Sequence, residues 1–188
     1  MTDSERAAAS RESARADAEI EACRAHTRKR AQEMWDRARP VSTAPVKFDY
    51  LQRKNIEAHG TKLLNRRLLV PMHDINGHLQ TVQLIGPLGD KQFLPGGRVQ
   101  GCFFLIGDDA QDKPLCIAEG FATGATIHEA TGLPVAVAFM AQNLVPVAET
   151  MRKAHPNRTL LLCGDDDAGK GDNPGRTAVA KACAQRVS

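Results

Sequence analysis

Three consecutive carboxylates, Asp165, Asp166 and Asp167, directly follow an apolar run that starts at Leu160. Adjacent like charges repel one another, so folding alone gains little from such a cluster. Carboxylate oxygens are the ligands that Mg²⁺ prefers in proteins. Two such ions can hold the attacking and the leaving oxygen in a phosphoryl transfer. The cluster therefore predicts a site for hard divalent cations, Mg²⁺ or Mn²⁺.

A fourth carboxylate, Glu119, ends a second apolar run and is followed by Gly120. A glycine beside an acid leaves room for a phosphate or a metal ion to approach the backbone. Taken singly, each feature has a simpler explanation: Glu119 could pair with a nearby arginine, and the aspartates could form a solvated loop or cap a helix. The combination of Glu-Gly after one strand and Asp-x-Asp after another is more specific and favours the metal site.

Strands and helices alternate through residues 113–188, and the strands are apolar on both faces. This is typical of a parallel sheet covered by helices. Gly132 is expected to end the first helix and Asn143 to cap the second. Ligands of parallel sheets bind beyond the carboxyl ends of the strands, so we expect Glu119 and the aspartates at one edge. Strands are expected at 114–120, 133–139 and 158–164, and helices at 121–132, 143–156 and 175–186.

Residues 45–112 predict a small, mostly antiparallel α+β subdomain. Asn76-Gly77 between two apolar runs is a hairpin signal. The basic side chains of this segment form either a DNA-binding surface or the solvated face of its strands; they are Lys62, Arg66, Arg67, Lys91 and Arg98. Strands are expected at 67–74, 78–86, 91–97 and 102–107.

Residues 1–44 predict a helical arm and a linker, because Ala, Arg and Glu dominate and no Gly or Pro precedes Pro40. Only Ile20, Cys23, Met34 and Trp35 hint at an apolar stripe, so we expect a solvated helix. The alternative is a basic arm that contacts nucleic acid through Arg24, Arg28, Lys29 and Arg30.

The composition excludes several classes of protein. The chain has 188 residues and a formal net charge of +3, which permits a nucleic-acid partner without requiring one. Its five cysteines form no close C-x-x-C pair, so zinc is not expected and the thiols are expected to be reduced. No signal peptide or long apolar span is present, which predicts a cytoplasmic protein without a membrane partner.

Two stretches carry a resemblance to a known family: "CIAEGFATGATIHEATGLPVAVAF" and, further on, "LLLCGDDDAGKGDNPG". They resemble the Toprim domain of DNA primases encoded by plasmids and phages. The segment "LLVPMHDINGHLQTVQLIGPLGDKQFLPGGRV" resembles the subdomain that precedes Toprim there, so the likeness covers about residues 45–184. In that family the carboxylates that match Glu119, Asp165 and Asp167 hold Mg²⁺ for nucleotidyl transfer or phosphodiester cleavage.

The resemblance implies an enzyme that synthesises primers on single-stranded DNA from nucleoside triphosphates, with a replicative helicase or another replication protein as a further partner. Asp166 would be an extra metal ligand, and Gly120, Asn143 and Lys170 would contact the nucleotide or its phosphates.

One departure from the family pattern keeps other hypotheses open. Primases of this kind often carry an aspartate where this chain has Met140. The alternatives are a non-catalytic nucleic-acid-binding remnant of a primase, or a fragment of a Toprim nuclease or topoisomerase. A topoisomerase needs a tyrosine nucleophile, and the only tyrosine, Tyr50, lies far from the acidic run in the sequence.

Overall fold

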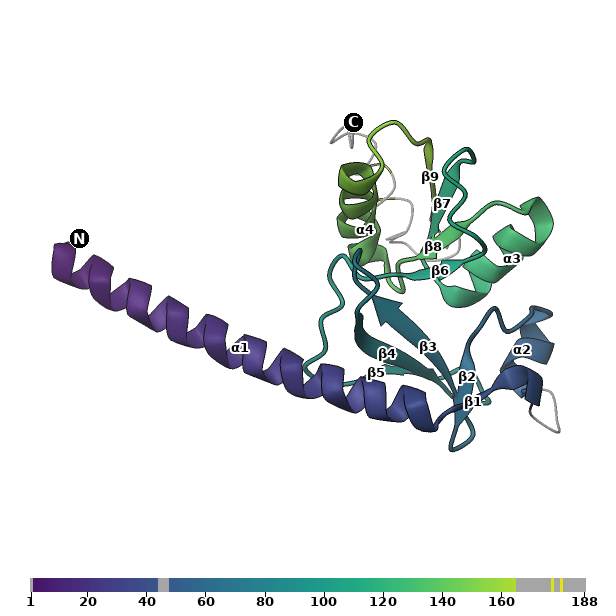
Figure 1. Ribbon diagram of the computed structural model, residues 1–188, viewed down its shortest axis with the longest axis horizontal. Coiled ribbons are helices and arrows are strands. Elements are labelled where there is room, and N and C mark those ends of the chain that lie inside the picture. The colour runs from purple at the N-terminus through teal and green to yellow at the C-terminus, as the bar shows by residue number, and fades with distance from the viewer. Residues whose placement is uncertain (1, 44–47, 165–176, 178–179, 181–188) are drawn as a thin grey trace.

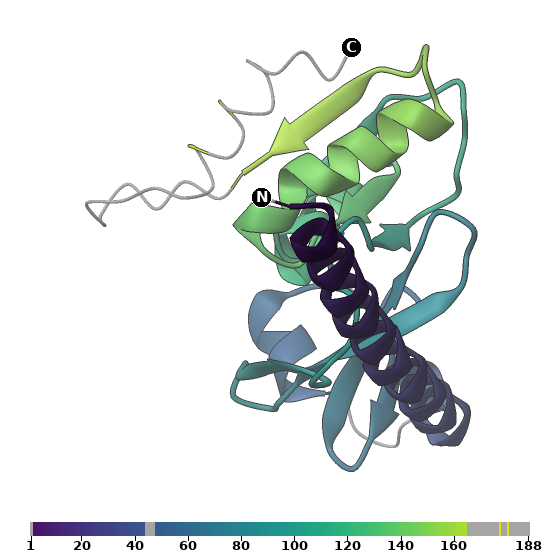
Figure 2. The ribbon, with the colours of Figure 1, turned by 90° about the vertical axis from the view of Figure 1, so that its left-hand side faces the viewer.

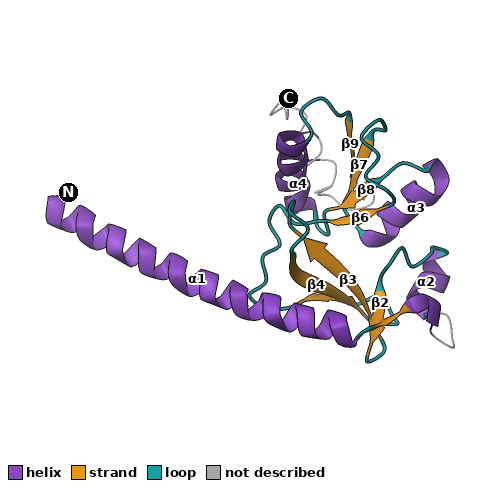
Figure 3. Cartoon of the chain, viewed as in Figure 1, coloured by secondary structure: helices purple, strands orange, loops and turns teal. Residues whose placement is uncertain are grey.

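The structure is a computed structural model that describes residues 2–43, 48–164, 177 and 180. It contains two sheets with helices packed against them, and a long N-terminal helix that extends away from both (Figures 1 and 3). The mixed α/β class expected from the sequence is confirmed.

The first sheet is antiparallel and has the strand order β1-β2-β3-β4-β5. The expected hairpin is confirmed: β3 pairs with β4 across a loop of residues 74–78. The carboxylate of Asp74 accepts hydrogen bonds from the backbone N–H groups of Asn76 and His78, both at 3.0 Å. Gly77 closes this turn with a φ of +80°, which favours glycine. The strands are β1 (Arg39–Pro40), β2 (Lys62–Leu64), β3 (Arg67–His73), β4 (Leu79–Ile85) and β5 (Lys91–Phe93).

The second sheet has the strand order β6-β8-β7-β9. Strands β7 (Leu115–Ala118), β8 (Val135–Val137) and β9 (Leu160–Cys163) are parallel, as expected, and β6 (Phe104–Ile106) runs antiparallel to β8. Successive residues of β7 and β8 enter different core clusters, one formed with helix α3 (Phe121–Thr131) and the other with helix α4 (Ala141–Ala154). The two helices therefore cover opposite faces of the sheet.

Helix α3 ends where the sequence predicts, with Gly132 at a φ of +67°. Its Gly124 allows close packing on β8, because a Cβ atom at that position would lie 2.8 Å from a methyl carbon of Val137. The third helix expected at 175–186 falls almost entirely outside the described residues.

Strand β6 corrects one expectation. The run 102–107 was assigned to the antiparallel subdomain, but it pairs with β8 and so completes the second sheet. The physical reason is that the two sheets share one core. Leu68 and Met72 of β3 pack in the same cluster as Phe104 of β6 and Val137 of β8. The domain bounds at 1–44, 45–112 and 113–188 stay a prediction.

The N-terminal arm is one helix, α1 (Asp3–Arg37), whose two halves differ. Residues 2–22 are exposed and extend from the body of the protein (Figure 1); in Figure 2 this end of the helix faces the viewer. The second half packs against β4: Ala31 contacts the core with Val82 and Leu94, and the Thr27 hydroxyl donates to the Pro95 carbonyl at 2.9 Å. The expectation of a solvated helix is wrong for this half, because small buried residues such as Ala31 make the contact.

Two short helices lie between β1 and β2 in the chain: a 3₁₀ turn at Val41–Thr43 and helix α2 (Asp49–Lys54). No helix within the described ranges has the length and apolar character needed to cross a membrane.

The described cysteines are free thiols, as expected. Cys102 and Cys116 are buried, and burial raises the pKa of each to about 11. Both therefore stay protonated at neutral pH. Cys23 differs because it is exposed on α1, and Cys183 lies outside the described residues.

Candidate metal and nucleotide site

Glu119 lies at the carboxyl end of β7, directly beside the strand that leads into the aspartate cluster. Strands β7 and β9 are parallel neighbours, and Ala118 is paired with Cys163. The next residues, Glu119 and Gly164, therefore leave the sheet at the same level, with neighbouring strands about 4.8 Å apart. The expectation that β7 and the strand before the aspartates end at the same edge of the sheet is confirmed, and the structure adds that these two strands are adjacent. Asp165, Asp166, Asp167 and Lys170 lie outside the described residues, so their convergence with Glu119 stays a prediction.

Two backbone hydrogen bonds fix the Glu119 segment. The N–H of Ala138 donates to the carbonyl of Ala118 at 2.8 Å, which holds the end of β7 against the end of β8. Gly120 is the N-cap residue of α3, and its carbonyl accepts from the N–H of Gly124 at 2.9 Å. The acid therefore lies between a strand end and a helix N-terminus, where the helix dipole favours bound anions.

A basic pocket adjoins Gly120. It has a volume of about 400 Å³ and lies between α2, the loop after β4, and the first turn of α3; α2 lies below α3 in Figure 1. Three cationic side chains line it, those of Arg53, Lys54 and Lys91, and none of its described lining residues is acidic. Lys91 Nζ would be 3.8 Å from a Cβ atom placed on Gly120. The pocket can therefore receive a phosphate group beside Glu119.

Tyr50 lines the same pocket and is only 2% exposed. Its hydroxyl is buried and has no hydrogen-bond partner within the described part of the chain. Burial raises the pKa of this phenol although Arg53 opposes the shift, so it stays protonated and able to donate. An unpaired buried hydroxyl is unusual and is consistent with a ligand partner.

The sequence did not single out Arg53, Lys54 or Tyr50 for this pocket. The signal was weak, since a basic pair in a short helix is common on protein surfaces. The stretch "DYLQRK" forms α2, and only the fold brings it against the start of α3.

The five basic residues expected to bind DNA fall into three groups according to their surroundings. Lys62 and Arg67 already have protein partners: Lys62 Nζ donates to the Trp35 carbonyl at 3.1 Å, and Arg67 pairs with Asp90 at 3.1 Å. Lys91 lines the basic pocket. The remaining two are exposed, Arg66 in the turn between β2 and β3 and Arg98 in the loop before β6.

Asn143 differs from its expected position. Helix α4 begins at Ala141 with Met140 as its N-cap residue, so the prediction of Asn143 as the cap is wrong. The side chain is 3% exposed and joins three segments. Its oxygen accepts from the Gly101 N–H at 2.8 Å, and its nitrogen donates to the carbonyls of Cys102 and Ala138, each at 2.9 Å. Both amide N–H groups are used inside the protein, and a contact with nucleotide stays a prediction.

Replacing Asn143 by alanine is expected to lower the free energy of unfolding by about 3 kcal/mol. The change leaves buried backbone groups of Gly101, Cys102 and Ala138 unpaired, at about 1–3 kcal/mol each before relaxation. Urea denaturation measures the loss, and Gln142→Ala, an exposed neighbour on the same helix, should stay within about 0.5 kcal/mol. A loss below about 1 kcal/mol for Asn143→Ala would contradict the role of its amide.

Comparisons with known proteins place this site in a family. Residues 114–187 match the family model described as the Toprim domain. This part of the chain is therefore a Toprim domain, which confirms the resemblance seen in the sequence.

The chain is also similar to two Escherichia coli proteins, both named DNA primase TraC. It is 36% identical to one over 143 residues and 36% identical to the other over 148 residues, covering 71% and 73% of this chain. It spans only 14% and 10% of their lengths. The solved catalytic core of DnaG shares the fold, with a TM-score of 0.52 and 13% identity over 87% of this chain and 66% of that one.

No group of three or more histidine, cysteine or acidic residues that could hold a metal ion occurs among the described residues. Of the four predicted metal ligands only Glu119 is described, and the other three follow β9.

Proposed function

We propose that this chain carries the catalytic centre of a DNA primase, which synthesises primers on single-stranded DNA in the presence of Mg²⁺ or Mn²⁺. The observation that carries the proposal is the position of Glu119. This residue lies beside the end of β9, the strand that the aspartate run follows, and it directly precedes Gly120, which lines the basic pocket. An edge that carries the predicted metal ligands, with a cationic pocket of about 400 Å³ beside it, suits nucleotidyl transfer. The similarity to proteins named DNA primase supports the same reaction.

In this proposal Glu119, Asp165 and Asp167 hold the metal, with Asp166 as an extra ligand. Their oxygen donors are of the kind that Mg²⁺ takes, and the half-exposed Glu119 leaves a ligand access to it. Bound Mg²⁺ would neutralise part of the negative charge on the phosphates of the nucleotide.

The protein itself binds and orients the nucleotide. The cationic side chains of Arg53, Lys54 and Lys91 would hold its phosphates, together with the N-terminus of α3 at Gly120. Lys170 would add a further phosphate contact.

The template and the partners form the rest of the proposal. Exposed Arg66 and Arg98 would contact the phosphates of single-stranded DNA, and that binding would weaken with salt. A replicative helicase or another replication protein would act with the chain in the cytoplasm.

The test is a primer-synthesis assay on circular single-stranded DNA with labelled nucleoside triphosphates and either Mg²⁺ or Mn²⁺. Labelled oligonucleotides are expected from the parent chain and not from the double variant Asp165→Asn, Asp167→Asn. The same template, end-labelled after linearisation, reports cleavage in a parallel reaction. Cleavage without synthesis would instead identify a nuclease.

A non-catalytic DNA-binding module is the second candidate, and Met140 favours it. This residue follows the carboxyl end of β8, next to β7, where an acid would extend the same edge of the sheet. Binding of single-stranded DNA with neither synthesis nor cleavage under any divalent metal would support this candidate.

A further inference from the structure

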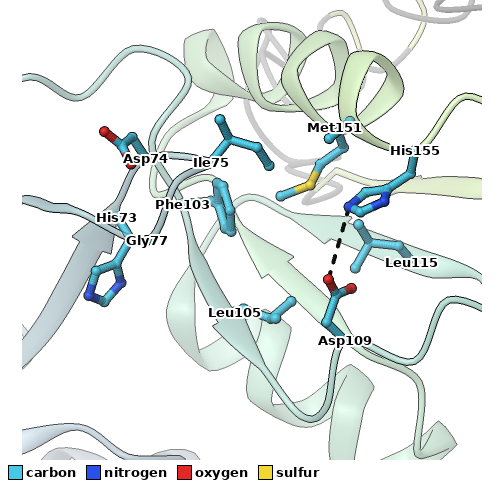
Figure 4. Close-up of a pocket in the computed structure, with 11 residues that line it drawn as sticks. His73, Asp74, Ile75, Gly77, Phe103, Leu105, Asp109, Leu115, Met151 and His155 are labelled. Atoms are coloured by element: carbon cyan, nitrogen blue, oxygen red, sulfur yellow. Dashed lines mark ion pairs between the residues drawn. The ribbon is translucent and has the colours of Figure 1, made fainter.

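An apolar groove of about 440 Å³ lies between the β3–β4 hairpin loop, β6 and the end of α4. We call it the apolar groove, and its apolar walls are formed by Ile75, Phe103, Leu105, Leu115 and Met151 (Figure 4). The figure shows these side chains gathered around one space, with His155 and Asp109 at one end of it. Sites that accept a ligand or an anchoring side chain are commonly concave and apolar in this way.

The groove is separate from the candidate catalytic site. Leu115 is the first residue of β7, whereas Glu119 follows the last residue of the same strand. The two sites share no lining residue: the apolar groove lies on the face of the sheet that α4 covers, whereas the basic pocket is lined by α2, the loop after β4 and the start of α3. A molecule bound there would leave Glu119 and the basic pocket accessible.

Ile75 is the exposed part of the groove. It is 42% exposed in a hairpin turn whose geometry depends on the Asp74 carboxylate and on Gly77. Turns of this kind need Asp, Asn and Gly at specific positions and make no demand for a large apolar residue beside them. Ile75 therefore has no evident role in the turn itself, and it enlarges the apolar surface opposite Met151.

The rim of the groove is acidic on the side of the loop that follows β6. Asp108, Asp109 and Asp112 are exposed in that loop. One oxygen of Asp109 accepts from the buried guanidinium of Arg158, and the other lies 4.0 Å from His155 Nε2. Asp74 adds a carboxylate on the hairpin side.

Arg158 offsets the charge of Asp109, and Lys113 directly follows Asp112 in the same loop. With Asp74, Asp108 and Asp112 counted against Lys113, the rim still carries more negative than positive charge. Lys153 is two residues from Met151, which places it on a different face of α4. An acidic rim disfavours nucleic acid, although the chain as a whole carries a net charge of +3.

We propose that the apolar groove docks a peptide segment of another protein, with an apolar anchor residue flanked by basic residues. A leucine or phenylalanine side chain would fill the space between Ile75 and Met151, as anchors of protein interfaces fill pockets. Lysine or arginine beside it would face Asp108 and Asp112 across the rim. This interaction is independent of the catalytic proposal.

The test uses the whole chain with methionine methyl groups labelled with ¹³C, followed by NMR. The probe is the hexapeptide Lys-Lys-Leu-Phe-Lys-Lys, and the comparison peptides are Glu-Glu-Leu-Phe-Glu-Glu and Lys-Lys-Ala-Ala-Lys-Lys. A saturable shift of the Met151 methyl signal is expected with the probe alone. The Met72 signal, from the fully buried core of the first sheet, should stay in place.

Two matched variants locate the binding surface. Ile75→Asn should lower the affinity for the probe peptide about fivefold, because it removes apolar area from the exposed wall of the groove. Ile20→Asn, the same change at a comparably exposed isoleucine on α1, should leave the affinity unchanged. The pair Asp108→Asn, Asp112→Asn should weaken binding severalfold and reduce its salt dependence.

Four results would overturn the proposal. They are an unmoved Met151 signal at saturating probe, equal shifts with the acidic peptide, no effect of Ile75→Asn, and an equal shift with a twelve-residue thymidine oligonucleotide. A Met151 shift that grows with protein concentration alone, and that Ile75→Asn removes, would identify the groove as a contact between copies of this chain instead.

Discussion

Replacing Glu119 by glutamine is expected to reduce primer synthesis at least about a hundredfold while leaving the affinity for single-stranded DNA within twofold. The amide keeps the size of the side chain and removes the negative charge at the carboxyl end of β7. Groups that only support a metal ligand already contribute about 10–100-fold, so a ligand itself should matter at least as much. Template binding depends on basic side chains elsewhere, and the substitution does not touch them.

The matched control is Glu149→Gln, an exposed glutamate on α4 that undergoes the same change. Primer synthesis by this variant should equal that of the parent chain. Circular dichroism and thermal melts verify that both variants are folded. Retention of a third or more of the activity by folded Glu119→Gln would exclude this acid from the metal site and would leave Asp165 and Asp167 as the residues to test.

The parallel direction of β7, β8 and β9 could be predicted because the signal is local. Strands β7, β8 and β9 are short apolar runs, β7 and β8 are buried on both faces, and Gly132 marks the end of the helix between them. Parallel strands of this kind leave the sheet at one edge, so the position of Glu119 followed from the sequence. Strand β6 was misassigned, because its three residues contain no information about a partner some 30 residues further along the chain.

The parts that the sequence missed depend on contacts between distant segments. Asn143 has the residue type of a helix cap, yet its side-chain amide forms hydrogen bonds with the backbone of Gly101 and Cys102, about 40 residues earlier. A hydrogen bond of that kind leaves no periodic pattern. The second half of α1 was missed because its buried contact uses Thr27 and Ala31, which are too small or too polar to form an apolar stripe.

Lys91 shows how the fold can change a functional expectation. From the sequence it was one of five scattered cations in a strand-rich segment, which suggested contacts with the DNA backbone. The structure places its Nζ atom beside Gly120, in the pocket that also contains Arg53. That position predicts a contact with a nucleotide phosphate, which is a more specific role.

Replacing Lys91 by methionine is therefore expected to weaken the binding of a non-hydrolysable nucleoside triphosphate about tenfold to a hundredfold. Methionine keeps much of the aliphatic stem and removes the ammonium group. A hydrogen bond to a charged group contributes about 1.5–3 kcal/mol, which corresponds to that range of affinity. Isothermal titration calorimetry in the presence of Mg²⁺ measures the change.

The control for Lys91→Met is Lys153→Met, which removes the same charge from an exposed position on α4 outside the pocket. If the pocket holds the triphosphate, only Lys91→Met should lower nucleotide affinity, and neither variant should greatly change the salt dependence of single-stranded DNA binding. An equal loss in both variants would mean that the nucleotide responds to overall charge alone. If Lys91→Met lowers the affinity for DNA and leaves the affinity for nucleotide unchanged, Lys91 contacts the template. Lys170, which follows β9 in the sequence, would then be the residue to test for the phosphate contact.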